Sequence, residues 1–348
     1  MEIVVPELVR IKPQALQRLG KYLRTSNCSE IALFWGDGLK QLFNSTVEVS
    51  LQSSGITVLH EKNVNTTSIE EIFENSLDIP SATSAIVAIG GGQVIDYCKY
   101  ISFITKKKLF TVPTIISNDS FCSPVASLYV RNKKRSISTN LPYSVIIDTD
   151  ILQNAPQKYI FSGMGDLLCK TTAIFDWKLS YKKTGEYVND FSVVIVRTAL
   201  DAFINFPDKD LSNPDYVRTI GSSLMMTGIA MEIAGISRPA SGSEHLISHA
   251  YDKISKSPSL HGIQTGIAAY AVSFVQKETH NEIRKSMESC GFDKFAAENP
   301  LNREELITAV RHAPSIKENF YTILSQPGAL EEIINFINSD ELMRSMAV

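Results

Sequence analysis

Short apolar runs in the first 150 residues constrain the fold of this chain more than any other feature. Each run ends at a glycine or a polar turn, and the runs are IALFW at 31–35, GITVLH at 55–60, SAIVAIGGG at 84–92, LFTVPT at 109–114 and SVIIDTDIL at 144–152. Continuous runs rich in Val and Ile are typical of strands that are buried on both faces. Helical patterns lie between them, such as IEEIFENSL after Ser68. We therefore expect βαβ units, a mostly parallel sheet, and ligands at the carboxyl ends of its strands.

After Leu152 the periodicity becomes helical almost throughout. Asn154-Ala155-Pro156 is typical of a helix start, and helical patterns cover residues 190–206 and 330–338. The length of 348 residues also favours two domains. We expect an α/β domain at residues 1–152 and an all-helical domain at residues 153–348.

Composition excludes several classes of partner. The formal net charge of −3 provides no basic field for nucleic acid, and the short basic run RNKKR at 131–135 suits a hairpin tip or a substrate-facing loop. No run reaches the roughly 18 continuous apolar residues that a membrane span needs, and the N-terminus lacks the pattern of a signal peptide. Five scattered cysteines without a C-x-x-C pair indicate reduced thiols. We therefore expect a cytoplasmic protein without nucleic-acid or membrane partners.

Two glycine turns follow predicted strands. GGGQVID at 90–96 leaves the run AIVAI and enters a helix, and Gly36 ends the run at 31–35. Glycines let a phosphate approach the backbone, and a helix N-terminus offers N–H donors, so Gly36, Gly91 and Gly92 are candidate cofactor contacts. A tight turn without a ligand explains the pattern equally well. Asp96 either bonds the cofactor or favours the helix start.

The loop after the run at 109–114 is rich in short polar side chains, namely Thr114, Ser117, Asn118, Asp119, Ser120 and Ser123. Such a loop can hold a nicotinamide amide and a polyol. The alternative is an ordinary turn with Asx and Ser caps.

Histidines gather in the stretch SRPASGSEHLISHAYDKISKSPSLHG at 237–262. The chain has six histidines, and His245, His249 and His261 all lie here. His245 and His249 are spaced i and i+4, which puts both rings on one face of a helix. They either cap helices and pair locally or bind an ion together with a carboxylate from elsewhere.

Asp166, in GMGDLLCKTTAIFDWKLS at 163–180, can supply that carboxylate. We expect it in the first turn of an apolar helix with Lys170 at i+4. The plain interpretation is a capping Asp and a surface ion pair. The functional interpretation adds Asp166 to His245 and His261, which leaves a position open as a catalytic zinc site requires; the same set suits Fe(II).

These pieces, in this order, resemble the polyol dehydrogenase branch of the iron-containing alcohol dehydrogenase superfamily. The matching stretches are GGGQVID, PTIISNDSFCSP, LPYSVIIDTDIL, APQKYIFSGMGDLLCK with its Asp176-Trp177, SRPASGSEHLISH, LHG and NFYTIL. The resemblance is to the glycerol-1-phosphate dehydrogenases first and glycerol dehydrogenase next. It implies a dehydroquinate synthase-like fold, with a dinucleotide-binding α/β domain, a helical domain that binds metal and substrate, and the site in the cleft between them. It also implies a homo-oligomer.

The resemblance assigns roles to the candidate residues. Asp166, His245 and His261 would bind zinc, with Fe(II) or another divalent metal as the alternative. The cofactor, NAD or NADP, would contact Gly91, Gly92, Asp96, Thr114, Ser117 and Ser123. Asp119 would bond the substrate hydroxyls, His249 would relay the proton, and Lys170 would meet a substrate phosphate, with Arg238 or Lys253 as helpers. Hydride would pass between the nicotinamide and a polyol or its phosphate.

A departure in one loop, an open choice of cofactor and two rivals accompany this hypothesis. The loop reads Ser117-Asn118-Asp119-Ser120-Phe121-Cys122, which resembles glycerol dehydrogenase more than the S-x-D-G of the phosphate dehydrogenases. Residues 59–62 contain His60 and Lys62, which tolerate a 2′-phosphate, and Glu61, which opposes one, so we lean to NAD. The rivals are a cyclising lyase of the 3-dehydroquinate synthase type and a repurposed, non-catalytic member.

Overall fold

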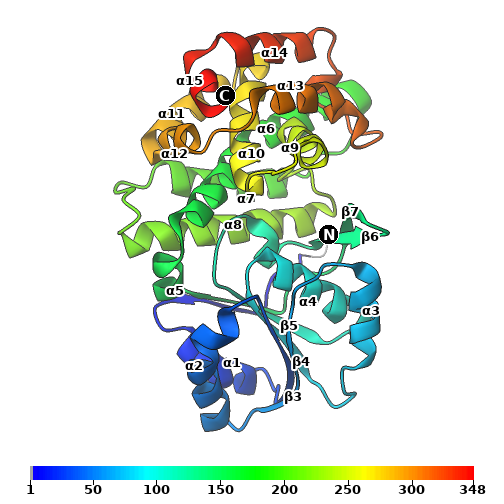
Figure 1. The fold of residues 1–348 in the computed structure, drawn as a ribbon, viewed down its shortest axis with the longest axis vertical. Helices are drawn as coiled ribbons and strands as arrows, with labels where there is room; N and C mark the ends of the chain where they lie inside the picture. The colour runs from blue at the N-terminus through cyan, green and yellow to red at the C-terminus, as the bar shows by residue number, and fades with distance from the viewer. Residues whose placement is uncertain (1–2) are drawn as a thin grey trace. The chain divides into compact units, whose positions relative to one another are not determined.

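The computed structural model describes residues 3–348, and the chain divides into two compact units (Figure 1). The first contains the chain up to Pro156 and the segment Leu211–Glu232, and the second contains Gln157–Asp210 and Ile233–Val348. The chain is α/β up to Pro156 and helical after it, so both of these predictions are confirmed. The expected domain boundary after Leu152 stays a prediction.

The first unit is built on a six-stranded parallel sheet with the order β1-β8-β5-β4-β2-β3. Its strands are β1 Leu8–Lys12, β2 Glu30–Trp35, β3 Thr57–Asn63, β4 Ala85–Gly90, β5 Lys108–Pro113 and β8 Ser144–Asp148. Every residue of β4 is buried, as a strand covered on both faces requires. The five predicted runs all contain strands, and the parallel sheet is confirmed.

Helices cover both faces of this sheet. The helices of the first unit are α1 Leu19–Thr25, α2 Leu39–Ser53, α3 Ile69–Leu77, α4 Gly92–Thr105, α5 Thr149–Asn154 and α8 Pro214–Ala234, with short 3₁₀ turns η1 Leu16–Arg18 and η2 Asp119–Cys122. In Figure 1, α1 and α2 lie on one face and α3 and α4 on the other. The Ser68 hydroxyl accepts a hydrogen bond from Glu71 N, 3.5 Å away, at the predicted start of α3.

The run at 144–152 does not remain a strand to its end. β8 stops at Asp148, whose carboxylate accepts hydrogen bonds from Asp150 N (3.1 Å), Gln14 N (3.1 Å) and Leu16 N (2.9 Å). An Asp at this position caps a helix, so α5 begins at Thr149. The expectation of a strand across the last residues of the run is therefore wrong.

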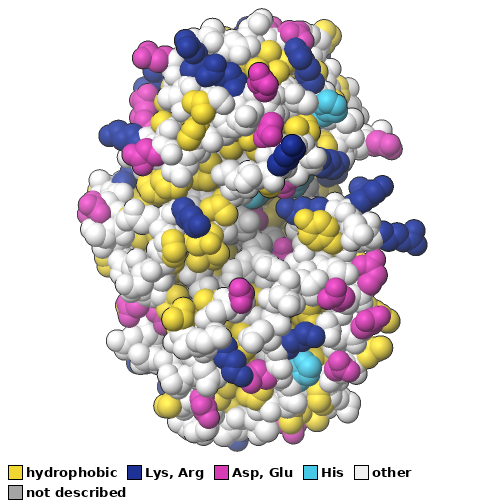
Figure 2. All heavy atoms as spheres, in the orientation of Figure 1, with side chains coloured by type: hydrophobic (Ala, Val, Ile, Leu, Met, Phe, Trp, Pro, Cys, Tyr) yellow, Lys and Arg dark blue, Asp and Glu magenta, His cyan; other side chains and the backbone are white. Residues whose placement is uncertain are grey.

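A separate hairpin contains the basic run. β6 Val125–Val130 and β7 Lys133–Ser138 are antiparallel, and Arg131 and Asn132 between them have φ of 47° and 60°. Two residues with positive φ form the tight turn that suits the twist of a hairpin, so the predicted hairpin tip is confirmed. In Figure 2, dark blue side chains project at the position of this hairpin.

The second unit is helical. Its helices are α6 Gln157–Thr184, α7 Asp190–Ile204, α9 Ser243–Ile254, α10 His261–Gln276, α11 His280–Cys290, α12 Phe292–Glu298, α13 Arg303–His312, α14 Ala329–Ser339 and α15 Glu341–Met346, with 3₁₀ turns η3 Ala313–Ser315 and η4 Ile323–Ser325. Across residues 3–348, the structure shows no helix with the length and apolarity to cross a bilayer.

Glycines let α6 and α10 approach closely. A Cβ at Gly165 would collide with the carbonyl oxygen of Gly262, and a Cβ at Gly262 would collide with that of Ser162. The two backbones are therefore in contact where α10 begins. This contact places His261, the first residue of α10, beside the N-terminal third of α6.

Candidate functional site

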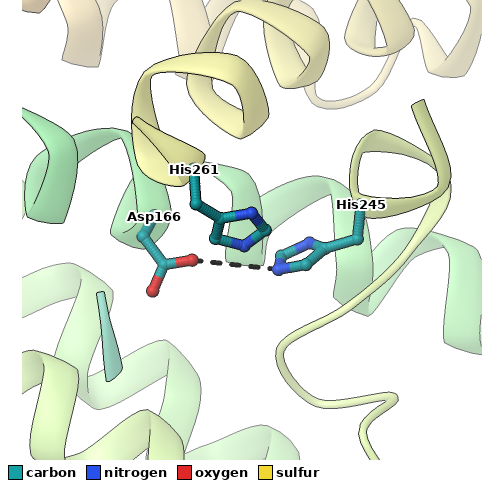
Figure 3. A group of neighbouring side chains, drawn as sticks. All are labelled: Asp166, His245 and His261. Carbon is teal, nitrogen blue, oxygen red and sulfur yellow. Dashed lines mark ion pairs between the residues drawn. The ribbon is translucent and has the colours of Figure 1, made fainter. Parts of the chain in front are cut away.

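Three helices of the second unit bring one carboxylate and two imidazoles together (Figure 3). Asp166 lies on α6, His245 on α9 and His261 at the start of α10. One ligand atom from each lies within 4.8 Å of the others, and His245 Nε2 is 3.8 Å from Asp166 Oδ1. Ligands of a tetrahedral zinc ion, with bonds of about 2.1 Å, lie about 3.4 Å apart. Small inward movements of these side chains would complete such a geometry, so the donor set fits a divalent cation.

Asp166 lies deeper in its helix than the sequence indicated. The expectation of a first-turn position is wrong, because α6 begins at Gln157, directly after Pro156, and continues through Gly163 and Gly165. Asp166 therefore caps nothing. Its ion pair with Lys170 is also not at the surface, since both side chains are 1% exposed and Lys170 Nζ donates to Asp166 Oδ1 at 2.9 Å.

His249 joins the other two histidines. Its ring centroid lies 6.2 Å from that of His245 and 5.8 Å from that of His261, and its side chain is half-buried. The predicted common face of His245 and His249 is confirmed, because α9 is helical through both. All three histidines of the stretch are thus neighbours.

A buried glutamate that sequence reasoning missed contacts this group. Glu244 is fully buried, and its Oε1 lies 2.9 Å from His245 Nδ1. Burial raises the pKa of Glu244, while hydrogen bonds to its carboxylate and the charge of Lys170 act in the opposite direction. The available signal was a carboxylate directly beside a candidate ligand, at a helix start that is otherwise made of Gly and Ser residues. Cys169, Glu244 and His245 also form a second group with metal-ligand spacing.

A second buried carboxylate holds the segments around the histidines. Asp176 on α6 accepts hydrogen bonds from Ser243 N (2.7 Å) and Ile323 N (2.8 Å). Burial, together with the charge of Glu244, raises the pKa of Asp176 to about 7. The start of α9 and the segment at η4 are thereby tied to α6.

Arg238 is engaged elsewhere in the second unit. Its guanidinium makes two hydrogen bonds to Glu186, at 2.9 and 2.6 Å, and lies 3.5 Å from the ring centroid of Phe320. The guanidinium is held by these contacts and is 1% exposed. The expectation that Arg238 helps to bind a substrate phosphate stays a prediction.

The glycine turns of the first unit meet at the carboxyl ends of three neighbouring strands. Gly36 N donates to Ile89 O at 2.9 Å, and Thr114 N donates to Gly90 O at 3.2 Å. Gly90 has φ +150°, and a Cβ there would lie 2.6 Å from Val94 Cγ1. Gly91 then caps α4, whose first residue is Gly92. The turns after β2, β4 and β5 are thus adjacent, and α4 presents its N-terminus there.

Asp96 and Ser123 are bound by a lysine that the sequence did not single out. Lys99 Nζ lies 2.8 Å from Asp96 Oδ1 and 3.1 Å from Ser123 Oγ, and Asp96 Oδ2 accepts a hydrogen bond from Ser127 N at 3.0 Å. These contacts join α4 to the start of the hairpin. Ser117 is half-buried, and Asp119 Oδ2 accepts a hydrogen bond from Thr227 of α8 at 3.3 Å.

Comparison with known proteins gives consistent relatives. Residues 10–156 match a family model described as iron-containing alcohol dehydrogenase. The chain is 32% identical over 342 residues to the glycerol-1-phosphate dehydrogenase [NAD(P)+] of Staphylothermus marinus, covering 95% of each chain. It is 36% identical over 249 residues to the enzyme of that name from Pyrococcus horikoshii, covering 71% of each. A glycerol dehydrogenase structure from Schizosaccharomyces pombe shares the fold, with a TM-score of 0.78 at 18% identity, covering 99% of this chain and 91% of that one.

Proposed function

Because the chain belongs to the glycerol-1-phosphate dehydrogenase family of iron-containing alcohol dehydrogenases, we propose that it transfers a hydride between a nicotinamide dinucleotide and a small polyol phosphate. Glycerol 1-phosphate and dihydroxyacetone phosphate are the expected pair, with glycerol and dihydroxyacetone next. The observation that carries this proposal is the convergence of Asp166, His245 and His261 from three helices.

These three residues would hold the metal. One carboxylate oxygen and two imidazole nitrogens suit zinc first and Fe(II) second. When bound, a divalent cation supplies Lewis-acid chemistry that favours ionisation of the secondary alcohol. Asp166 contributes the anionic ligand, and burial of the site strengthens its attraction to a cation.

The remaining roles fall to protein groups near these ligands. His249 is half-buried and next to both histidine ligands, and histidine is a residue type suited to a proton relay. Lys170 is one helical turn from Asp166 and offsets the charge of that carboxylate. We propose that the same ammonium attracts the phosphate of the substrate, and that Asp119 bonds the substrate hydroxyls.

The glycine turns of the first unit would bind the dinucleotide. Backbone N–H groups at Gly91 and Gly92 and the N-terminus of α4 suit a pyrophosphate. Gly36, Thr114 and Ser117 would line the same strand ends. Asp96 and Ser123 both contact Lys99 and would support the cofactor site through this lysine. Glu61 accepts hydrogen bonds from Trp35 Nε1 (2.8 Å) and Lys40 (2.6 Å) near the end of β3, which favours NAD over NADP.

We further propose that the protein is a homo-oligomer in the cytoplasm. The test of the function is an initial-rate panel with NADH and NADPH, each against dihydroxyacetone phosphate, dihydroxyacetone and glyceraldehyde phosphate, with bound metal measured in the same preparation. The expected result is fastest oxidation of NADH with dihydroxyacetone phosphate. A metal-loaded protein that consumes neither nucleotide with any of these carbonyl compounds would contradict the proposal and favour a lyase that returns its hydride within one turnover.

A further inference from the structure

Each histidine ligand has one ring nitrogen toward the candidate metal position and the other toward a different hydrogen-bonding group. A neutral imidazole binds a metal through its unprotonated nitrogen, and the partner of the other nitrogen decides which one that is. The protons around His245 and His261 can be assigned one at a time from the donors and acceptors that contact them.

Glu244 determines the tautomer of His245. Its Oε1 lies 2.9 Å from His245 Nδ1 and also accepts a hydrogen bond from Gly242 N at 2.6 Å, while Oε2 lies 2.9 Å from Thr172 Oγ1. A carboxylate only accepts hydrogen bonds, so His245 Nδ1 carries the proton. The unprotonated nitrogen is then Nε2, which is the nitrogen 3.8 Å from Asp166 Oδ1.

An uncharged pair of side chains, Ser248 and Gln264, places the proton of His261 on the same ring nitrogen. Gln264 Nε2 donates both protons, to Asp252 Oδ1 at 3.0 Å and to Ser259 O at 2.8 Å, which fixes the orientation of its amide. Gln264 Oε1 therefore accepts the single hydroxyl proton of Ser248, 2.7 Å away. Ser248 Oγ then acts as an acceptor toward His261 Nδ1 at 3.2 Å. His261 Nδ1 thus carries the proton, and Nε2 does not.

We propose that Glu244 and the Ser248–Gln264 pair are positioning residues that hold both histidines with the proton on Nδ1, so that both Nε2 atoms are ready to bind the metal. This inference rests on the proposed metal site. The two networks are unlike, because a buried carboxylate orients His245 and an uncharged amide–hydroxyl pair orients His261. The carboxylate also increases the basicity of its histidine, so its removal has the larger effect on metal affinity.

Glu244 has one competing role. Together with Cys169, whose Sγ lies 3.9 Å from His245 Nδ1, it could be a direct metal ligand. That role requires an unprotonated His245 Nδ1. The positioning role requires a protonated one, so the position of a single proton in the metal-free protein separates the two.

The test uses the full chain, labelled with ¹⁵N-histidine and freed of metal by chelation. Long-range ¹H–¹⁵N correlation spectra report the protonated nitrogen of each ring, and competition with a chromophoric chelator gives the zinc affinity. The variants are Glu244→Ala, Glu244→Gln and Ser248→Ala. Ser273→Ala is the matched control, because Ser273 Oγ lies 3.0 Å from His280 Nδ1, a histidine outside the site.

We expect both site histidines to carry the proton on Nδ1 in the unaltered protein. Glu244→Ala should move the proton equilibrium of His245 alone toward Nε2 and weaken zinc binding about 10–100-fold, and Ser248→Ala should do the same to His261 with a smaller loss. Glu244→Gln keeps an accepting oxygen and should retain the tautomer with an intermediate affinity. Ser273→Ala should change only His280.

Several results would overturn the proposal. Protons on Nε2 in the unaltered metal-free protein would do so, as would tautomers and zinc affinities in Glu244→Ala and Ser248→Ala equal to those of the unaltered chain. If Glu244→Ala does not fold, the other two variants decide the outcome. Glu244→Gln should lower the zinc affinity, and Ser248→Ala should change the tautomer of His261. An unaltered protein that binds no zinc would refute the metal site itself, which is a separate failure.

Discussion

The close contact of α6 and α10 predicts a large effect from adding one methyl group. Gly262 follows the candidate ligand His261, and a Cβ at Gly262 would overlap the carbonyl oxygen of Ser162 and lie 2.8 Å from its Oγ. The same Oγ accepts a hydrogen bond from Gly262 N at 3.1 Å. Gly262→Ala therefore forces α10 away from α6 at the point where the ligands meet.

The size of the effect follows from three contributions. Overpacking costs about 1–3 kcal/mol, loss of the Gly262–Ser162 hydrogen bond about 0.5–1.5 kcal/mol, and the helix propensity of Ala returns about 1 kcal/mol. We expect the free energy of unfolding to fall by about 0.5–3.5 kcal/mol on these figures. Zinc affinity should fall as well, because His261 moves with the start of α10.

Urea denaturation of the metal-free protein measures the first quantity, and chelator competition the second. Gly221→Ala is the matched control, because Gly221 also lies in a helix, α8. A Cβ there would meet only Ile147 Cδ1, at an ordinary contact distance of 3.5 Å. That variant should gain about 0.5–1 kcal/mol from helix propensity and keep its zinc affinity. If Gly262→Ala matches Gly221→Ala in both measurements, the argument from the helix contact is wrong.

Three further predictions concern the charged groups of the second unit. His245→Ala and His261→Ala should each lose bound zinc and turnover together, whereas His249→Ala should keep the metal and lose turnover, as elemental analysis and initial rates would show. Lys170→Ala should raise the KM for dihydroxyacetone phosphate and, because it leaves Asp166 buried without this ion pair, lower the free energy of unfolding of the metal-free protein by about 3–5 kcal/mol; an unchanged KM would refute the phosphate role. The pKa of Asp176 is raised from its ordinary 3.8 to about 7 by burial, so the folded state binds the extra proton and stability should fall as pH rises through that window. Urea titrations across it should show this slope in the unaltered protein and a smaller slope in Asp176→Asn; an identical slope in both would refute the assignment.

Local pattern predicted the fold well where burial is uniform. The run at 84–92 became β4 because a strand covered on both faces needs apolar side chains on both, which the sequence displays without knowledge of its neighbours. β1 Leu8–Lys12 was missed because this edge strand is only partly buried and contains Arg10 and Lys12, so it is not a continuous apolar run. β6 and β7 were missed because neither is an apolar run buried on both faces and β7 is largely exposed, although the turn between them was recognised.

The residues of the candidate site also differ in whether the local sequence could predict them. His245, His249 and His261 stand out as a cluster because their spacing is local, and the structure brings their rings together. The depth of Asp166 within α6 and the role of Glu244 depend on contacts between helices distant in sequence. No periodicity within one segment reports that Gly165 touches Gly262 or that Lys99 binds Asp96 and Ser123.

α8 belongs to the first unit although it follows α6 and α7 in the chain, and this order has a consequence for synthesis. This helix packs on the first unit through Gly221 beside Ile147 and through Thr227 on Asp119, yet it is made only after α6 and α7, which belong to the second unit. The sheet therefore emerges from the ribosome complete in its strands but without the helix that contacts β8 and η2. Domains generally fold as units during synthesis, so here the N-terminal unit must wait for a segment that interrupts its partner. A fragment that ends at Pro156 would contain every strand of the sheet and would always lack α8.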